Sequence, residues 1–444
     1  MSNNCVVSGS LTDGQSVALQ SPADILIIGA GPGGYRAAEY AAKQGLKVVI
    51  VEEGEVGGTC LNIGCIPTKT YVHSATFAEA RERMATVIPQ LRAGVEGILS
   101  HPNITLLRGR ASFVSPSECS VCGDIIAAKN IIIATGSETK WLPIKGLDDP
   151  RVVDSTGLLQ LETLPKKLCI IGAGVIGMEF ASVFNRFGSE VTVIEYLKEC
   201  LPALDSDIAK RLRKQLEKKG VTFKMKTAVE NIADLDGDVI LMATGRKPRT
   251  EGLGLGTLGI TLEKNGAIPV DDHFRVVSGS LTDGQSVALQ SSADIYAIGD
   301  VNGRQMLAHA AEMQAVHAVN HIIGKQDAIR FDVMPAAIFT DPEAACVGPT
   351  EDQLKADGIS YECRKAFWRA NGKALAMDET EGMLKLFSAD DGRLLGCHAF
   401  GAHAADIVQE VSVLMCRDTT ISQLRDMVHI HPTLGEILFS AVSD

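Results

Sequence analysis

Two cysteines lie in the segment GGTCLNIGCIPTK, residues 57–69. Cys60 and Cys65 are five positions apart, about a turn and a half of helix, so a slightly distorted helical start would bring their sulfurs within reach of a disulfide. Such a pair could carry out reversible thiol–disulfide chemistry. The spacing alone fits equally well two unrelated buried thiols, because cysteine is often a core residue.

A second candidate pair lies near the C-terminal end, in MVHIHPTLGEILF, residues 427–439. His431 and Glu436 are five positions apart across a proline and a glycine, so a carboxylate–imidazole contact is possible. Such a contact would hold one tautomer and raise the basicity of the ring. The alternative is a solvated histidine near a helix start. On these residues alone, His309, His317 and His429 show no comparable partner pattern and are interpreted as ordinary histidines.

The element preceding the cysteines is a complete nucleotide-binding unit. An apolar run over residues 24–30 leads into glycines at Gly29, Gly31 and Gly34, then a helical stretch and a second apolar strand ending at Glu52. The glycines permit a tight turn and close approach to a pyrophosphate, and the acid can accept bonds from a ribose. A flavin ring is expected just beyond such a unit, where the cysteines lie, so we interpret the pair as a redox relay.

The same unit recurs over residues 168–195, with Gly172, Gly174, Gly177 and a terminal Glu195. The first glycine and the acid have the same spacing in both units, so a chance match is a poor explanation. A carboxylate at Glu195 would repel a 2′-phosphate, which predicts a preference for NAD over NADP.

Further apolar strands that end in glycine predict a layered α/β architecture, at residues 130–136, 239–245 and 295–300. Asp300 ends the last of them and could bond a cofactor polyol or cap the following turn. From residue 333 the pattern changes to alternating strands and turns, with an apolar-striped helix over residues 404–416 that could be core or a subunit contact.

The bulk composition limits the possible functions. A chain of 444 residues is expected to form two or three domains. A formal charge of −12 without basic runs argues against nucleic acid or anionic membranes as main partners. The start lacks a secretory signal pattern, and no apolar run approaches about 18 residues. Eleven scattered cysteines fit a reducing compartment, so a cytoplasmic protein is expected.

These motifs, together with AIGDVNGRQMLAHAA, FTDPE and HIHPTLGE, resemble the pyridine nucleotide–disulfide oxidoreductases. The likeness runs from about Ala23 to the C-terminus, and ATGRKPRTEGLGL and NGKALAMDETEG are similar to the branch that oxidises dihydrolipoamide. The resemblance implies two Rossmann-like domains, binding FAD and NAD, plus a C-terminal α+β dimerisation domain. It divides the chain into a first FAD-binding part (1–147), an NAD-binding domain (148–270), a central part completing the FAD domain (271–331) and an interface domain (332–444).

The resemblance also implies roles for individual residues. Cys60 would be the interchange thiol and Cys65 the charge-transfer thiol facing the flavin. His431, oriented by Glu436, would be the acid/base and would reach into the partner subunit's site. Lys69 would lie near the flavin and pair with Glu179; a cation there would stabilise a reduced flavin. Further cofactor contacts are implied for Thr135, Gly136, Gly245, Met306, Leu307, Ala308 and His309.

The implied reaction is oxidation of dihydrolipoamide by NAD. A substrate thiolate formed by His431 attacks Cys60, the second thiol closes lipoamide, and Cys65 passes the electrons to FAD, which gives hydride to NAD. The implied form is a homodimer, with lipoyl groups of 2-oxo acid dehydrogenase complexes or of the glycine cleavage system as substrates. No metal is implied.

Alternatives remain open. A glutathione- or trypanothione-type reductase should prefer NADP and carry basic residues around position 195. A mercuric reductase should carry extra cysteines near its C-terminus. A third alternative is a flavin-binding or complex-assembly protein with weak catalysis, and the retained cysteines, His431 and Glu436 argue against it.

The chain departs from the family pattern in three places. The segment 6–25 is repeated at 276–295, differing only at Pro22 and Ser292, and each copy is predicted to form a β-hairpin around a TDG turn. The second copy is an insertion relative to the family. The segment 229–238 lacks a hairpin usual in the family, and the stretch 75–105 is short.

Overall fold

A computed structural model describes residues 7–8, 22–278, 287–288 and 292–443. The chain forms two compact units, each built from three segments. The first comprises residues 1–70, 81–140 and 246–329, and the second comprises residues 71–80, 141–245 and 330–444. The predicted domain boundaries at residues 147, 270 and 331 stay a prediction.

The first unit contains an eight-stranded sheet in the order β1-β4-β3-β2-β7-β6-β5, with β17 also pairing with β7. Strands β4, β3, β2, β7 and β17 pair parallel with one another, as βαβ units require, whereas β1 pairs antiparallel with β4 and β6 pairs antiparallel with β7. The strands are β1 (Val7–Ser8), β2 (Ala23–Ile28), β3 (Val48–Glu52), β4 (Ile104–Arg108), β5 (Ala111–Ser115), β6 (Glu118–Val121), β7 (Asp124–Ile133) and β17 (Asp294–Ala297).

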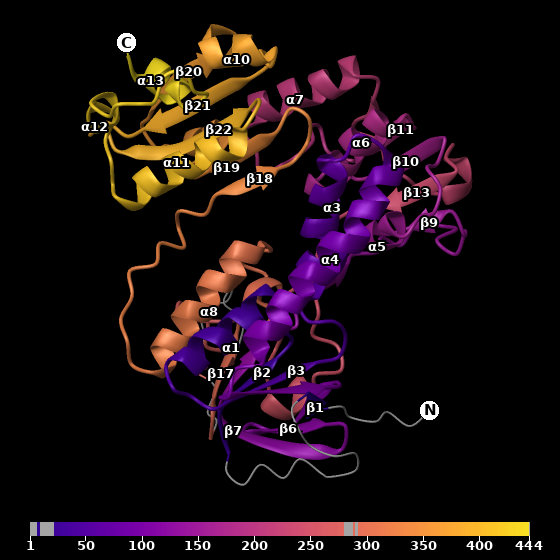
Figure 1. The fold of residues 1–444 in the computed structure, drawn as a ribbon, viewed down its shortest axis with the longest axis vertical. Coiled ribbons are helices and arrows are strands. Elements are labelled where there is room, and N and C mark those ends of the chain that lie inside the picture. Colours follow the sequence, from indigo (N-terminus) through magenta and orange to yellow (C-terminus); the bar gives the residue numbers. More distant parts are fainter. Residues whose placement is uncertain (1–6, 9–21, 279–286, 289–291, 444) are drawn as a thin grey trace. The chain divides into compact units, whose positions relative to one another are not determined.

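Helices α1 (Pro32–Lys43) and α8 (Ala308–Ile322) pack side by side in the first unit (Figure 1). Small residues on α1 make this close packing possible, because Ala37, Ala38 and Ala41 are fully buried. The unit also holds the two-stranded sheet β8 (Ser137–Thr139) and β14 (Arg246–Pro248) and the turns η2 (Leu255–Leu258) and η4 (Gly299–Asn302). Helices α2 (Gly58–Ile63), α3 (Cys65–Val72) and α4 (Phe77–Leu99) lie between β3 and β4 in the chain.

The repeated segment is only partly described. In the second copy, β15 (Val277–Ser278) pairs antiparallel with β16 (Val287–Ala288), as the hairpin prediction requires. In the first copy, β1 pairs antiparallel with β4. The rest of the first predicted hairpin and the turn of the second lie outside the described residues.

The second unit contains a five-stranded parallel sheet in the order β12-β11-β10-β13-β9. Its strands are β9 (Val152–Val153), β10 (Lys167–Ile171), β11 (Glu190–Ile194), β12 (Thr222–Lys224) and β13 (Val239–Met242), and its helices are α5 (Ser155–Leu159), α6 (Val175–Phe187) and α7 (Ser206–Lys218). The predicted short connection before β13 forms only the turn η1 (Ile232–Asp234). Ile232 is fully buried and packs with Ile240 and Met242.

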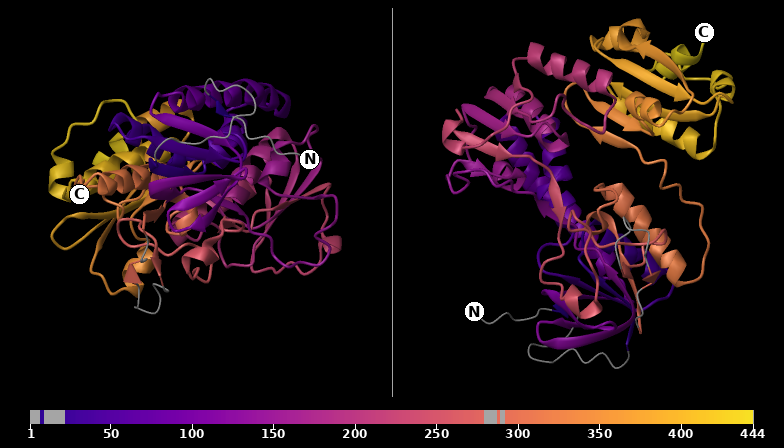
Figure 2. Two further views of the ribbon diagram at one scale, coloured as in Figure 1. Left: turned by 90° about the horizontal axis from the view of Figure 1, so that it is seen from below. Right: turned by 180° about the vertical axis from the view of Figure 1, so that it is seen from behind.

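The C-terminal part of the second unit is an antiparallel sheet in the order β18-β19-β22-β21-β20, with helix α11 against it; two further views are given in Figure 2. Its elements are β18 (Ala336–Ile338), β19 (Ala344–Val347), α9 (Glu351–Ala356), β20 (Glu362–Phe367), η5 (Trp368–Ala370), α10 (Gly372–Met377), β21 (Met383–Ser388), β22 (Leu394–Phe400), α11 (Ala404–Cys416), α12 (Ile421–Arg425) and α13 (Glu436–Val442). The predicted fold class, two α/β dinucleotide-binding parts and an α+β C-terminal part, is confirmed.

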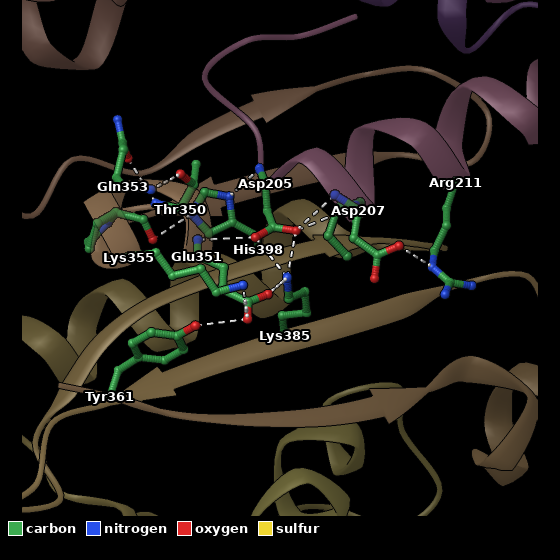
Figure 3. A network of polar contacts seen from close by, with 12 residues as sticks. Asp205, Asp207, Arg211, Thr350, Glu351, Gln353, Lys355, Tyr361, Lys385 and His398 are labelled. Carbon is green, nitrogen blue, oxygen red and sulfur yellow. Dashed lines mark hydrogen bonds and ion pairs between the residues drawn. The ribbon is translucent and has the colours of Figure 1, made fainter. Parts of the chain in front are cut away.

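A buried polar network joins α7 to the C-terminal sheet within the second unit (Figure 3). Asp205 caps α7 and accepts two 2.8 Å bonds from Lys385 on β21, and both side chains are only 1% exposed. Lys385 also bonds to Glu351, the first residue of α9. The imidazole Nδ1 of His398 accepts a 3.0 Å bond from the backbone N–H of Asp205. The buried ammonium is therefore neutralised by two carboxylates.

Candidate active site

The first glycine fingerprint is held in a conformation that only glycine fits. Gly29 has φ +102°, and a β-carbon added there would lie 2.4 Å from the carbonyl oxygen of Ala134. A β-carbon at Gly34 would lie 1.8 Å from the carbonyl oxygen of Gly29. Strand β2 and helix α1 therefore approach as closely as a dinucleotide-binding turn requires, at the helix N-terminus where such a turn holds a pyrophosphate. These residues fit the predicted FAD.

The second fingerprint has the same geometry in the second unit. Gly172 has φ +105°, and a β-carbon at Gly177 would lie 2.0 Å from the carbonyl oxygen of Gly172. A β-carbon at Gly174 would meet no atom within 4 Å, so this position borders open space at the start of α6. That opening is where the pyrophosphate of the predicted NAD fits.

The two predicted ribose acids make matching backbone bonds. The carboxylate of Glu52 accepts N–H groups from Ala30 at 2.6 Å and Gly54 at 2.8 Å. The carboxylate of Glu195 accepts N–H groups from Ala173 and Leu197, both at 2.7 Å. Each carboxylate is thus oriented at the end of its strand, and each oxygen keeps a lone pair for a ribose hydroxyl.

The cysteine segment is docked directly on the first fingerprint. The N–H of Gly57 donates to the carbonyl of Ala30 at 2.8 Å. A β-carbon at Gly58, which has φ +59°, would lie 2.7 Å from the Cα of Gly31. The start of helix α2 therefore contacts the turn that would hold the FAD pyrophosphate, and Cys60 lies on the first turn of this helix.

Two short helices hold the two cysteines, where the spacing suggested one distorted helical start. Cys60 belongs to α2 and Cys65 is the first residue of α3. They join at Gly64, where a β-carbon would lie 2.8 Å from the carbonyl oxygen of Thr59 and 3.3 Å from the Cα of Cys60. Glycine is needed here because the backbone of α3 starts against α2.

The sulfurs of Cys60 and Cys65 lie within hydrogen-bond distance of each other. The hydrogen bond between the two sulfurs, followed by burial, raises the pKa of the Cys60 thiol, while the nearby Lys69 ammonium lowers it. The bond to Cys65 and burial therefore disfavour the thiolate form of Cys60. Lys69 lies one helical turn after Cys65 on α3.

Sequence reasoning missed the groups that brace this segment. The side-chain amide of Asn62, between the cysteines, donates to the carbonyls of Val56 and Gly58 at 3.0 and 2.9 Å. Arg92 on α4 donates to the side-chain oxygen of Asn62 at 3.0 and 2.8 Å. Asn62 could have been singled out as a polar residue inside the cysteine motif, but nothing in the sequence points to Arg92.

Asp300 lies in the turn after β17 and bonds to a residue that sequence reasoning also missed. The hydroxyl of Ser137 donates to its carboxylate, and Arg246 donates to the same hydroxyl at 2.7 Å. Burial raises the pKa of Asp300, while the Ser137 bond and the Arg246 charge lower it. A buried carboxylate of this kind suits a bond to a cofactor hydroxyl.

The other predicted cofactor residues lie at the ends of strands or at helix starts. Thr135 donates to the carbonyl of Arg249 at 2.7 Å, and buried Glu179 accepts the backbone N–H of Phe339 at 2.9 Å. The pairing of Glu179 with Lys69 stays a prediction. Gly136 and Gly245 follow β7 and β13 with φ of +72° and +101°, and Met306, Leu307, Ala308 and His309 lie at the start of α8.

The predicted contact between His431 and Glu436 is present. The imidazole Nδ1 lies 2.9 Å from the Glu436 carboxylate, whose other oxygen accepts the N–H of Thr433 at 2.9 Å. These two bonds, the Thr433 bond first, lower the pKa of Glu436. The His431 side chain is 79% exposed. A fixed tautomer with an outward Nε2 suits an acid/base that acts on a substrate from outside this chain.

Two of the three histidines interpreted as ordinary have carboxylate partners, which the sequence did not indicate. His317 contacts Asp327 at 2.9 Å, and His429 contacts Glu410 at 3.1 Å. Both carboxylates are distant in sequence from any motif, so pattern reading could not pair them.

No group of three or more metal-binding side chains occurs in the described part of the chain. None of its helices is both long and apolar enough to span a membrane.

Two family models match the chain. Residues 23–315 match the pyridine nucleotide-disulphide oxidoreductase model, and residues 334–442 match the dimerisation domain of the same family. Curated relatives include the mitochondrial dihydrolipoyl dehydrogenase of Pisum sativum, 36% identical over 94% of this chain and 90% of that protein. The dihydrolipoyl dehydrogenase of Chlamydia muridarum is 36% identical over 93% of this chain and 95% of that protein. Leghemoglobin reductase of Glycine max is 36% identical over 94% of this chain and 86% of that protein.

Solved structures have the same fold. The HOCl-induced flavoprotein disulfide reductase RclA from Escherichia coli superposes with a TM-score of 0.86 at 32% identity, over 95% of this chain and 99% of that chain. LpdA from Mycobacterium tuberculosis superposes with a TM-score of 0.85 at 25% identity, over 94% of this chain and 98% of that chain.

Proposed function

The chain belongs to the pyridine nucleotide-disulphide oxidoreductase family, and we propose that it is an NAD-dependent dihydrolipoyl dehydrogenase. The reaction is the oxidation of dihydrolipoyl groups to lipoyl groups with reduction of NAD. The observation that carries this proposal is the docking of the Cys60–Cys65 segment on the first fingerprint, through Gly57 and Gly58. That arrangement would place a dithiol beside a dinucleotide held by the fingerprint.

The chain's own residues supply the cofactor sites. FAD would be held by the first fingerprint, with Glu52 at its ribose, Asp300 at its polyol and Lys69 near its ring. NAD would be held by the second fingerprint, with Glu195 at the ribose. When bound, FAD supplies a two-electron acceptor that can be reoxidised by NAD, which amino-acid side chains cannot provide.

The protein's part of the reaction is thiol–disulfide exchange. His431 takes the proton from a substrate thiol, and the resulting thiolate attacks the sulfur of Cys60 in the Cys60–Cys65 disulfide. A mixed disulfide forms at Cys60, and Cys65 leaves as a thiolate. The second substrate thiol then attacks the substrate sulfur in the mixed disulfide, which closes the lipoyl ring and releases Cys60, and its proton passes to the Cys60 sulfur while the first proton stays on His431.

A second candidate function is an NAD(P)H-dependent disulfide reductase, which runs the exchange in the opposite direction on another disulfide. The similarity to RclA, named a flavoprotein disulfide reductase, supports it. The two functions differ in the dithiol accepted and in the nicotinamide nucleotide used.

The test is anaerobic stopped-flow absorbance of the purified flavoprotein mixed with dihydrolipoamide and then with NAD. We expect the long-wavelength band of a thiolate beside oxidised flavin, followed by its loss when NAD is added. Cys65→Ser should abolish the band, whereas Cys122→Ser, at an exposed thiol outside the motif, should leave it unchanged.

The same mixing with glutathione and with NADP separates the candidates. Reduction by dihydrolipoamide with turnover on NAD supports a dihydrolipoyl dehydrogenase. Turnover with NADPH and a different disulfide, without a response to dihydrolipoamide, would favour the second candidate. Bound flavin without a band for any dithiol would show that the cysteines are not coupled to it and would contradict both.

The partners follow from the same proposal. The chain carries a dimerisation domain, and we propose a homodimer in which His431 of one subunit serves the cysteines of the other. The substrates would be lipoyl groups on carrier proteins of 2-oxo acid dehydrogenase complexes or of glycine cleavage. We propose a cytoplasmic location, supported by eleven cysteines that are scattered without a regular framework, which suits a reducing compartment.

A further inference from the structure

A second histidine–carboxylate pair lies two residues before His431. The imidazole Nε2 of His429 lies 3.1 Å from a carboxylate oxygen of Glu410 on α11. The His429 side chain is 9% exposed and that of Glu410 is 42% exposed. His429 thus ties the loop that carries His431 to a helix of the C-terminal core.

This pair contacts the segment that holds the catalytic dyad. A β-carbon at Gly435 would lie 3.7 Å from the Glu410 carboxylate and 4.0 Å from the His429 ring. Gly435 directly precedes Glu436, the residue that orients His431. The loop is closed by the Thr433 hydroxyl, which donates to the carbonyl of Ile430 at 2.7 Å. A shift of the His429 ring would therefore be transmitted to both members of the dyad.

The chemistry of the pair fixes the ring's tautomer. An ionised carboxylate only accepts hydrogen bonds. Nε2 of His429 therefore carries a proton and donates a hydrogen bond to Glu410. In the neutral ring Nδ1 is then an acceptor. This Nδ1 is buried and has no hydrogen-bond partner among the described residues. A buried polar atom without a partner costs stability, so a partner from outside the chain is expected.

The neighbours of His429 indicate where that partner comes from. Val428 and Ile430 are 98% and 78% exposed, on either side of the buried histidine. Exposed apolar side chains of this size mark an interaction surface. They lie within residues 334–442, which match a dimerisation domain. A second copy of this chain that covers Val428 and Ile430 would also reach the edge of the His429 ring.

We propose that Glu410 and His429 form a positioning pair for the His431–Glu436 dyad, and that His429 Nδ1 accepts a hydrogen bond from an N–H or O–H group of a second copy. The bond from His429 Nε2 to Glu410 orients His431, and the bond accepted by His429 Nδ1 forms only in the dimer. This inference rests on the proposed function only for the role of His431, and the dimer contact stands without it.

Two substitutions separate the two nitrogens of His429. The amide of His429→Gln reaches the position of Nε2 and keeps the bond to Glu410, whereas the amide of His429→Asn stays near Nδ1 and loses it. We expect His429→Asn to lower kcat for dihydrolipoamide about tenfold with KM unchanged, because a charge-assisted bond is lost. We expect His429→Gln to raise the dimer dissociation constant about tenfold, measured by sedimentation.

Glu410 provides the rescue test. Glu410→Ala should lower kcat like His429→Asn, and Glu410→Gln should restore most of it, since its amide oxygen can still accept from Nε2. His403→Asn is the matched control: His403 forms an exposed pair with Asp406 at 3.3 Å at the start of α11. It should leave kcat and the dissociation constant unchanged, and asparagine tolerates the positive φ of this position.

The outcomes separate the inference from the proposed function. Equal losses of kcat and of dimerisation in His429→Gln and His429→Asn would show a merely structural residue and overturn the proposal, as would wild-type behaviour of both. A kcat of Glu410→Gln no higher than that of Glu410→Ala would also overturn the proposal. If wild-type protein does not oxidise dihydrolipoamide, the proposed function fails. The dimer dissociation constant of His429→Gln, measured by sedimentation, still tests the dimer contact.

Discussion

The glycines of the two fingerprints show how single residues fix the cofactor sites. Gly34 and Gly177 each bring a helix against the carbonyl of the fingerprint's first glycine, with no room for one added carbon. Gly64 has the same function between the two cysteine helices. At these positions the absence of a side chain lets one backbone segment touch another, and the cofactor or the thiols occupy the space that results.

Gly34→Ala should abolish flavin binding. The new β-carbon would lie 1.8 Å from the Gly29 oxygen, so α1 must move away from β2 and the pyrophosphate turn must open. The ratio of flavin to protein absorbance in the purified protein measures the result. Gly94→Ala on α4, where a β-carbon meets nothing within 4 Å, should keep its flavin. Full flavin content in Gly34→Ala would contradict this account of the turn.

Glu195→Gln should relax the choice of nicotinamide nucleotide. The amide keeps the size of the carboxylate but not the charge that repels a 2′-phosphate. Its oxygen can replace only one of the two bonds that the carboxylate makes with Ala173 and Leu197, so affinity for NAD should fall modestly. We expect kcat/KM for NADP relative to NAD to rise about tenfold, on the order of 1.4 kcal/mol. An unchanged ratio would place the discrimination in other residues.

At the scale of elements, the network around Lys385 connects a helix to a sheet of a different part of the second unit (Figure 3). Asp205 caps α7 and at the same time accepts the backbone N–H of Glu351 at 3.1 Å. His398 completes the network by donating from Nε2 to the carbonyl of Pro349 at 3.1 Å. The position of α7 on β21 and β22 is therefore set by directional bonds to buried groups.

Lys385→Met should destabilise the protein by about 3–5 kcal/mol, because Asp205 and Glu351 would be left as adjacent carboxylates without a counter-charge. Chemical denaturation followed by circular dichroism measures the loss. Lys365→Met is the matched control, since Lys365 lies directly opposite on β20 and is exposed. A loss no larger than that of the control would show that the buried ammonium contributes nothing net.

Stability should fall on acidification in two stages. Burial lowers the pKa of His398 below its ordinary 6.5, so its contribution is complete above pH 6.5 and declines as pH falls below that value. The Lys385 bond lowers the pKa of Glu351 to about 2, so its contribution is complete above about pH 4.5 and is lost as pH falls through about 2. Urea midpoints measured from pH 7 to 3 should stay level down to about pH 6.5 and fall below that value, and Glu351→Gln should flatten the lower stage. A constant midpoint over this range would contradict the scheme.

At the scale of the whole molecule, the sequence predicted what depends on local pattern. Both βαβ units and the His431–Glu436 contact follow from residues close in sequence, whose spacing determines their geometry. The braces from distant residues, such as Arg92 on Asn62 and Glu410 on His429, could not be predicted, because any of many charged residues could have served. Lys385 stands in an ordinary strand sequence, and nothing local distinguishes a buried lysine from a solvated one.

The grouping of residues 71–80 with the second unit was also not predictable from pattern. Tyr71 and Phe77 pack against Phe184 and Phe187 of α6 with ring centroids 6.1 to 6.4 Å apart. Arg186 donates to the carbonyl of Tyr71 at 2.9 Å. Aromatic side chains in a short connecting segment give no indication of which distant helix they contact.

The segmented first unit has a consequence for synthesis on the ribosome. Residues 130–133 of β7 pair with β2 on one side and with β17 on the other. Strand β17 begins at Asp294, so the ribosome makes the whole segment 141–245 before it can close that edge. Until then the nascent chain presents an unpaired strand edge of isoleucines that are fully buried in the finished protein. Translation pauses before residue 294 should therefore prolong the stage at which this chain needs a chaperone.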